Sequence, residues 1–155
     1  MSALYDSDFY SWSRAQAAGL RRLAELRLND LPELDWCRLA GEIEELSRSL
    51  ERELHSRYAV LLLHLLKWQF QPGFRCGSWQ LSVTNQRRAI VRLLGKNPGL
   101  KSKAADEFVE AYEPARLKAT SETGLALVTF PELCPYSREQ VEDEGFWPGE
   151  DPDDL

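Results

Sequence analysis

Residues 35–71 read DWCRLAGEIEELSRSLERELHSRYAVLLLHLLKWQFQ, and this stretch decides the fold. It contains no proline and a single glycine, Gly41. At about 1.5 Å per residue, a helix of this length would be roughly 50 Å long, which exceeds the width of a small globular domain. Its apolar residues recur three or four positions apart, the spacing of one face of an α-helix: Leu39, Ile43, Leu46, Leu50, Leu54, Tyr58, Leu61, Leu65 and Trp68.

Three shorter helices are predicted around the long one. The first begins after Asp8, a favourable N-cap residue, and runs towards residue 28, before a break at 29–32. Pro72 and Gly73 end the long helix near Gln71, because proline cannot continue it. A third helix is expected over 78–93 and a fourth over 100–122, followed by an extended segment and a short helix over 137–144.

The pattern predicts an all-α fold, a four-helix bundle with one long central helix and an irregular acidic C-terminal segment. No alternating strand pattern is visible in the sequence. We expect one helical-bundle domain over residues 1–148 and a disordered acidic tail over 149–155. The long helix exceeds what three shorter neighbours can cover, so a second copy of the chain could pack against the overhang.

Composition limits the class of protein. The chain has 155 residues and a net charge of −6. From Glu132 onward it has nine acids and one base, so the preceding part is slightly basic. No apolar run approaches the ~20 residues that a membrane-spanning helix needs. The N-terminus carries acids where a secretory signal has bases. The three isolated cysteines indicate a reducing cytoplasm and neither disulfides nor a zinc framework.

A largely polar seam runs beside the apolar one on the long helix, and Glu42 and Glu45 lie on it three residues apart. Carboxylates from facing helices can hold metal ions, but di-iron bundles also use Glu-x-x-His pairs, and neither histidine has a glutamate three residues before it. Glu51 and His55 have a spacing that suits either a metal or an ordinary surface pair. We therefore expect no metal site, and instead a polar network of Glu42, Glu45, Arg52 and Arg87 across the bundle.

The C-terminal end of the long helix is the better candidate for a ligand-binding or catalytic pocket. Polar groups and large aromatic rings converge there from two helices, with Glu42 or Glu45 as a possible base. The alternative is a packed end of the bundle without a pocket. The same residues would occur there, because the Trp N–H and the His ring need hydrogen-bond partners. The candidate pocket residues are His64, Lys67, Trp68, Gln71, Trp79 and Gln86.

Other chemistry has little support in the sequence. No Ser or Cys lies in a nucleophile elbow, and no Gly-rich phosphate loop precedes a helix, so we expect no cofactor. Arg88 and Arg92 share a helix face that could touch phosphate. The acidic total and the absence of a helix-turn-helix pattern nevertheless argue against nucleic-acid binding.

Several blocks of this chain resemble a known bacterial family, domain of unknown function family 29. The resemblance implies a small, cytoplasmic, all-helical protein, and it implies no reaction, substrate, cofactor or catalytic residue. It is carried, in order along the chain, by residues 5–12 with Gln16, 42–46, 64–72, 78–79, 86–88, 122–124 and 130–131.

These observations favour a non-enzymatic helical protein that works through protein–protein association. The partner is a second copy of the chain, forming a homodimer along the long helix, or an unidentified protein. The alternative is the small-ligand or catalytic pocket at the C-terminal end of that helix.

Overall fold

The computed structural model describes residues 2–26, 31 and 33–149. Within these residues the fold is all-α, as predicted, with no strand. The predicted break at 29–32, apart from Leu31, and the tail from 150 lie outside the described residues. The helices are α1 Ser2–Ser7, α2 Phe9–Glu25, α3 Trp36–Phe70, α4 Gly77–Lys96, α5 Lys101–Thr123 and α6 Arg138–Glu142, with 3-10 turns η1 Pro72–Phe74, η2 Pro98–Leu100 and η3 Leu127–Thr129.

The predicted helix boundaries are close to those observed. The Asp8 carboxylate accepts a hydrogen bond from the Ser11 amide and caps α2. Asp35 accepts from the Arg38 amide at the start of α3, which ends one residue before Gln71. The short helix α1 was not predicted. None of the described helices has the length and apolarity that crossing a membrane requires.

The chain divides into two compact units, and α3 contributes to both. Unit 1 comprises Met1–Glu53 and Leu93–Lys103, and unit 2 comprises Leu54–Arg92 and Ala104–Leu155. The expectation of one domain over 1–148 stays a prediction.

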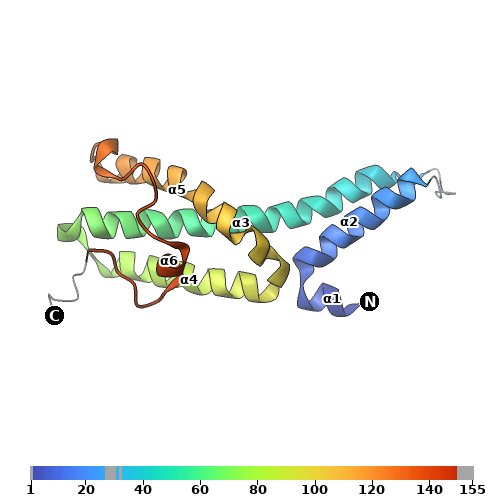
Figure 1. Cartoon of the computed structure of the whole chain (residues 1–155), viewed down its shortest axis with the longest axis horizontal. Helices are drawn as coiled ribbons and strands as arrows, with labels where there is room; N and C mark the ends of the chain where they lie inside the picture. The colour runs from blue at the N-terminus through green and yellow to red at the C-terminus, as the bar shows by residue number, and fades with distance from the viewer. Residues whose placement is uncertain (1, 27–30, 32, 150–155) are drawn as a thin grey trace. The chain divides into compact units, whose positions relative to one another are not determined.

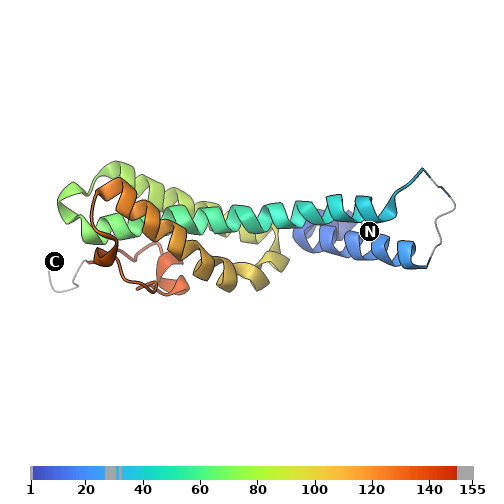
Figure 2. The ribbon, with the colours of Figure 1, turned by 90° about the horizontal axis from the view of Figure 1, so that it is seen from above.

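Unit 1 is built on α2 and the first half of α3, which lie side by side (Figure 1, Figure 2). Its buried residues on these helices are mostly small. Ser13 and Ala17 lie on α2, and Ala40 and Ser47 lie on α3. Small residues at such positions let two helix backbones approach closely. The second buried set comes from the end of α4 and the turn after it, and includes Leu93, Asn97 and Leu100.

The predicted apolar seam of α3 is correct in the second half of the helix and wrong in the first. Leu54, Tyr58, Leu61 and Leu65 are fully buried in unit 2, whereas in unit 1 Leu39 is 40% and Leu46 45% exposed. The buried residues in this half of α3 are small, and so are Ser13 and Ala17 of α2. The buried face of α3 is therefore displaced by one residue, to Ala40 and Ser47.

Unit 2 has the larger core, formed by the second half of α3 with α4 and α5. Four alanines of α5 are buried, Ala104, Ala111, Ala115 and Ala119. The rings of Tyr58 and Phe108 meet edge to face at 5.5 Å between α3 and α5. The C-terminal segment crosses these helices (Figure 1). It is held at its carbonyls, since the Tyr112 hydroxyl donates to Pro131 and the Arg116 guanidinium to Phe130.

Candidate functional site

Two of the six candidate pocket residues form one contact at the C-terminal end of α3. The Lys67 ammonium lies 3.1 Å from a carboxylate oxygen of Glu122 and 4.7 Å from the centre of the Trp79 ring. Gln71, one turn further on, donates from its side-chain amide to the Thr123 carbonyl at 3.4 Å. The end of α3 is thereby tied to α4 and to the end of α5.

Trp68 belongs to a different cluster, whose other members were not predicted. Its side chain is 5% exposed and packs against Trp147, with ring centres 4.6 Å apart. The Arg75 guanidinium lies 4.8 Å from the Trp68 ring centre and donates to the Trp68 carbonyl. The indole N–H of Trp68 has no hydrogen-bond partner among the described residues. Trp68 and Trp147 are far apart in the sequence, so no local sequence pattern could predict their contact.

His64 and Gln86 have separate partners. The Nδ1 atom of His64 lies 2.8 Å from the Val60 carbonyl of its own helix. The Gln86 side chain accepts a long hydrogen bond, 3.4 Å, from Arg57. None of the six predicted residues lines the cavity between α3 and α5 or the cavity beside Glu113 and Arg116.

The polar network of α3 is local to unit 1. Glu45 pairs with Arg52 at 2.5 Å and with Arg48 at 3.8 Å on the same helix. Glu44 pairs with Arg21 of α2, and this hydrogen bond lowers the pKa of the Glu44 carboxyl. Glu42 is exposed.

Arg87, the fourth residue expected in that network, has other partners. Its guanidinium is directed at the C-terminal segment and donates to three carbonyls, those of Val141 at 2.8 Å, Glu144 at 3.2 Å and Phe146 at 2.7 Å. The residue is only 2% exposed, and burial lowers the pKa of the guanidinium. Arg87 therefore secures the segment after α6 against α4.

A cluster of potential metal ligands lies elsewhere in unit 2. His55 of α3 and Glu107 and Glu110 of α5 each offer one donor atom, and these atoms all lie within 4.8 Å of one another. His55 Nδ1 lies 3.5 Å from a Glu107 oxygen. The sequence had paired His55 with Glu51, but the Glu51 carboxylate accepts the Tyr10 hydroxyl at 2.5 Å.

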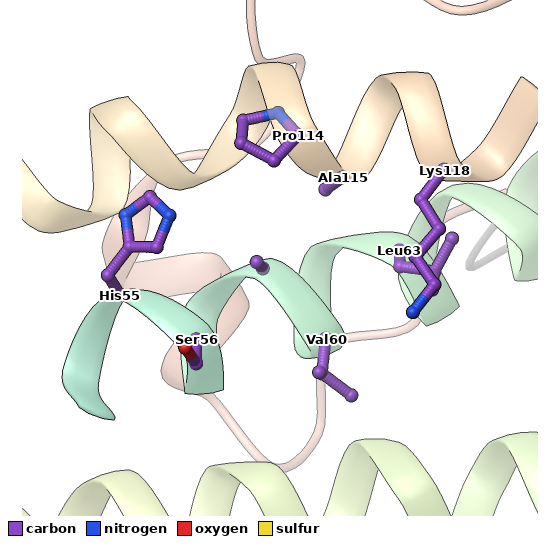
Figure 3. Close-up of a pocket in the computed structure, with 8 residues that line it drawn as sticks. His55, Ser56, Val60, Leu63, Pro114, Ala115 and Lys118 are labelled. Carbon is purple, nitrogen blue, oxygen red and sulfur yellow. The ribbon is translucent and has the colours of Figure 1, made fainter. Parts of the chain in front are cut away.

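A cavity of about 230 Å³ lies between α3 and α5 and includes His55 in its wall (Figure 3). Figure 3 shows His55 at one end and Lys118 at the other, with Pro114 and Ala115 on the α5 side. The lining is mainly apolar: His55, Ser56, Ala59, Val60, Leu63, Pro114, Ala115 and Lys118. A second cavity, of about 280 Å³, is lined by Glu113, Arg116, Glu132 and Leu133.

These features define a small all-α protein with one helix that runs through two packed units. The chain belongs to the family described as domain of unknown function DUF29, whose model matches residues 4–147. It is similar to an alpha-helical protein of unknown function from Rhodospirillum rubrum, with 26% identity and a TM-score of 0.68 over 92% of this chain and 90% of that one. No curated protein matches the chain.

Proposed function

We propose that the chain is a self-associating protein and that a second copy covers the outer surface of α2 and the first half of α3. The observation that carries this proposal is the inverted distribution of side chains in unit 1. Apart from Tyr10, the buried residues of α2 and of the first half of α3 are small, while several large apolar residues of unit 1 are exposed. A contiguous exposed apolar surface marks an interaction site, whereas apolar residues scattered singly are ordinary on a monomer surface. The exposed set in unit 1 is Leu4, Tyr5, Leu23, Leu26, Leu31, Leu39 and Leu46.

Charge complementarity favours a second copy as the occupant. Helix α2 carries three arginines and one glutamate, Glu25, so its net charge is positive. Residues 36–53 of α3 carry five glutamates and three arginines, so this half of the helix is negative. If α2 of one copy lies against α3 of the other, opposite charges meet at both contacts of a two-fold dimer. Two such helix pairs complete a four-helix bundle.

Light scattering at micromolar concentration tests the proposal. The wild-type chain should have about twice the 17.8 kDa mass of the monomer. Leu39→Asp with Leu46→Asp should give a monomer, because each change puts a carboxylate into the proposed apolar contact. Leu117→Asp is the matched control, since Leu117 is an equally exposed leucine on α5 of unit 2. A wild-type monomer would refute self-association and leave a different protein as the partner.

A small-ligand site at the C-terminal end of α3 is a second candidate, supported by the unpartnered indole N–H of Trp68 beside the Arg75 guanidinium. A buried donor next to a cation suits a small anion. Inorganic phosphate should then raise the melting temperature of the wild-type protein and not that of Trp68→Phe or Arg75→Gln. Equal responses of all three proteins would remove this candidate.

The proposed location is the cytoplasm. The three cysteines form no disulfide, and Cys37 and Cys76 are exposed thiols. Free exposed thiols are typical of proteins from reducing compartments. Recovery of the protein in the soluble cell fraction, with all three thiols reactive after denaturation, tests this assignment.

A further inference from the structure

We propose that His55, Glu107 and Glu110 bind a divalent transition-metal ion, and that Zn²⁺ fits this set of donors. Imidazole nitrogen and carboxylate oxygen are both ordinary zinc ligands. Mg²⁺ and Ca²⁺ prefer oxygen donors alone, and Cu⁺ prefers sulfur. The mixed set therefore favours a first-row ion of intermediate character.

The geometry suits such an ion. Zinc lies about 2.0–2.2 Å from nitrogen and oxygen ligands, which places two ligand atoms roughly 3.0–3.5 Å apart. His55 Nδ1 and the Glu107 oxygen are already 3.5 Å apart. The third donor, Glu110, is within 4.8 Å of both, and its exposed side chain can close the difference by rotation.

Rigid helices position the three donors. Glu107 and Glu110 are three residues apart and thus share one face of α5. Phe108, between them, is buried and packs against Tyr58 of α3, one turn after His55. Buried Ala104 and Ala111 flank the same region of α5. The packing that forms the core of unit 2 therefore also sets the separation between the imidazole and the carboxylates.

The adjoining cavity indicates which class of ligand such an ion would help to bind. Three protein donors leave a coordination position open, as in catalytic rather than structural zinc sites. His55 is both a donor of the cluster and part of the cavity wall. The rest of the wall is largely apolar, with the cationic Lys118 at the opposite end in Figure 3. The structure therefore favours a small ligand with an apolar body and an anionic group.

Calorimetric titration with Zn²⁺ tests the site. A Cys37→Ser, Cys76→Ser background removes the two exposed thiols, which would bind the same ion. The background protein should bind one Zn²⁺ per chain. His55→Ala and Glu107→Gln should each weaken Zn²⁺ binding at least ~10-fold. Substitution of residues that only hydrogen-bond to metal ligands already lowers metal affinity by this factor, and these two residues would be ligands themselves.

The matched controls are His64→Gln, which removes the other imidazole of the chain, and Glu113→Gln, which removes a neighbouring exposed carboxylate of α5. Both should bind Zn²⁺ as the background protein does. Circular dichroism confirms that each variant is folded. The proposal is overturned if the background protein shows no saturable site, or if the controls lose as much affinity as His55→Ala.

Replacement of Zn²⁺ by Co²⁺ provides a second readout. The visible spectrum of bound Co²⁺ should report four or five nitrogen and oxygen ligands, and this spectrum should disappear in His55→Ala. A spectrum that persists unchanged in His55→Ala would place the ion elsewhere and contradict the assignment. Addition of a short-chain carboxylate should perturb the spectrum if the open position faces the cavity. An unchanged spectrum would refute the ligand class.

Discussion

Arg87 shows how one residue can hold a segment that has little regular structure of its own. A buried guanidinium is costly unless its donors are satisfied, and here three of its nitrogens donate to the carbonyls of Val141, Glu144 and Phe146. Arginine is suited to this task because its donors form a rigid planar fork. The Trp147 ring lies 5.5 Å from the guanidinium carbon and covers it further.

Arg87→Lys should lower the free energy of unfolding by about 2 kcal/mol, because a lysine ammonium cannot reach three carbonyls spread over the segment. Arg88→Lys, at an exposed position of the same helix, should change it by less than about 0.5 kcal/mol. Urea denaturation measures both. Equal effects of the two substitutions would show that the carbonyl contacts add no stability.

Tyrosine ionisation should destabilise unit 2 at high pH. Burial raises the pKa of Tyr112 from 10.0 to about 12, and it also raises the pKa values of Tyr58 and Tyr136. Because the folded state holds these protons more tightly than the unfolded state, all three contributions are complete below pH 10 and decline above it, and that of Tyr112 is lost as pH rises through about 12. Melting temperature should fall across this interval, together with the appearance of tyrosinate absorption. A flat profile would contradict the assignment.

Tyr112→Phe is the variant that isolates one of these groups. It removes the hydroxyl whose ionisation destabilises the folded state at high pH. It also removes the hydrogen bond from that hydroxyl to the Pro131 carbonyl. We expect lower stability at neutral pH and a shallower decline at alkaline pH than in the wild-type protein.

At the scale of elements, Asp8 links α2 to the turn between α4 and α5. One oxygen of its carboxylate accepts the Ser11 amide at 3.1 Å and the other accepts the Gly99 amide at 2.9 Å. The turn is fixed a second time by Asn97, whose side chain accepts the Tyr10 amide and donates to the Leu93 carbonyl. The helix start and the turn are therefore one hydrogen-bonded structure within unit 1.

Gly99→Ala should destabilise this junction by about 1–2 kcal/mol, since a Cβ atom there would overlap the Ser11 side chain and crowd the Asp8 carboxylate. Gly95→Ala is the control, because Gly95 lies in α4 with open space around it. Alanine is the better helix former, so the control should gain up to about 1 kcal/mol. Thermal unfolding separates the two, and a gain in both would refute the crowding argument.

The helices were predictable because their signals are local. Asp8, Asp35 and Pro72 mark their own helix ends, and the periodicity of residues 54–68 identifies the core face of α3 correctly. The same periodicity failed over Leu39 to Leu46, since the buried face there depends on the small residues that α2 presents. A single sequence does not show which residues of α2 face which residues of α3.

The site was less predictable for the same reason. His55 is separated from Glu107 by about fifty positions, and only the register between α3 and α5 brings them together. The signal that was available is the pair Glu107 and Glu110 on one face of a helix with an alanine stripe. Of the two α3 carboxylates that the sequence singled out, Glu45 pairs with Arg48 and Arg52 on the same helix, whereas Glu42 is exposed.

At the scale of the whole molecule, the proposed association should make stability depend on protein concentration. Ligands and partners that bind only the folded state stabilise it by mass action, and a second copy is such a partner. The melting temperature of the wild-type chain should therefore rise with concentration, while that of Leu39→Asp with Leu46→Asp should stay constant. Differential scanning calorimetry at several concentrations measures this. A concentration-independent wild-type value would contradict the dimer.

The contacts of Arg87 also have a consequence for synthesis on the ribosome. Helices α3, α4 and α5 are complete by residue 123, but the carbonyls that satisfy the Arg87 guanidinium belong to residues 141–146. While the nascent chain is shorter than this, Arg87 must stay hydrated, which keeps that part of α4 from packing. Unit 2 should then reach its final form only after residue 146 has left the exit tunnel, and not when α5 is complete.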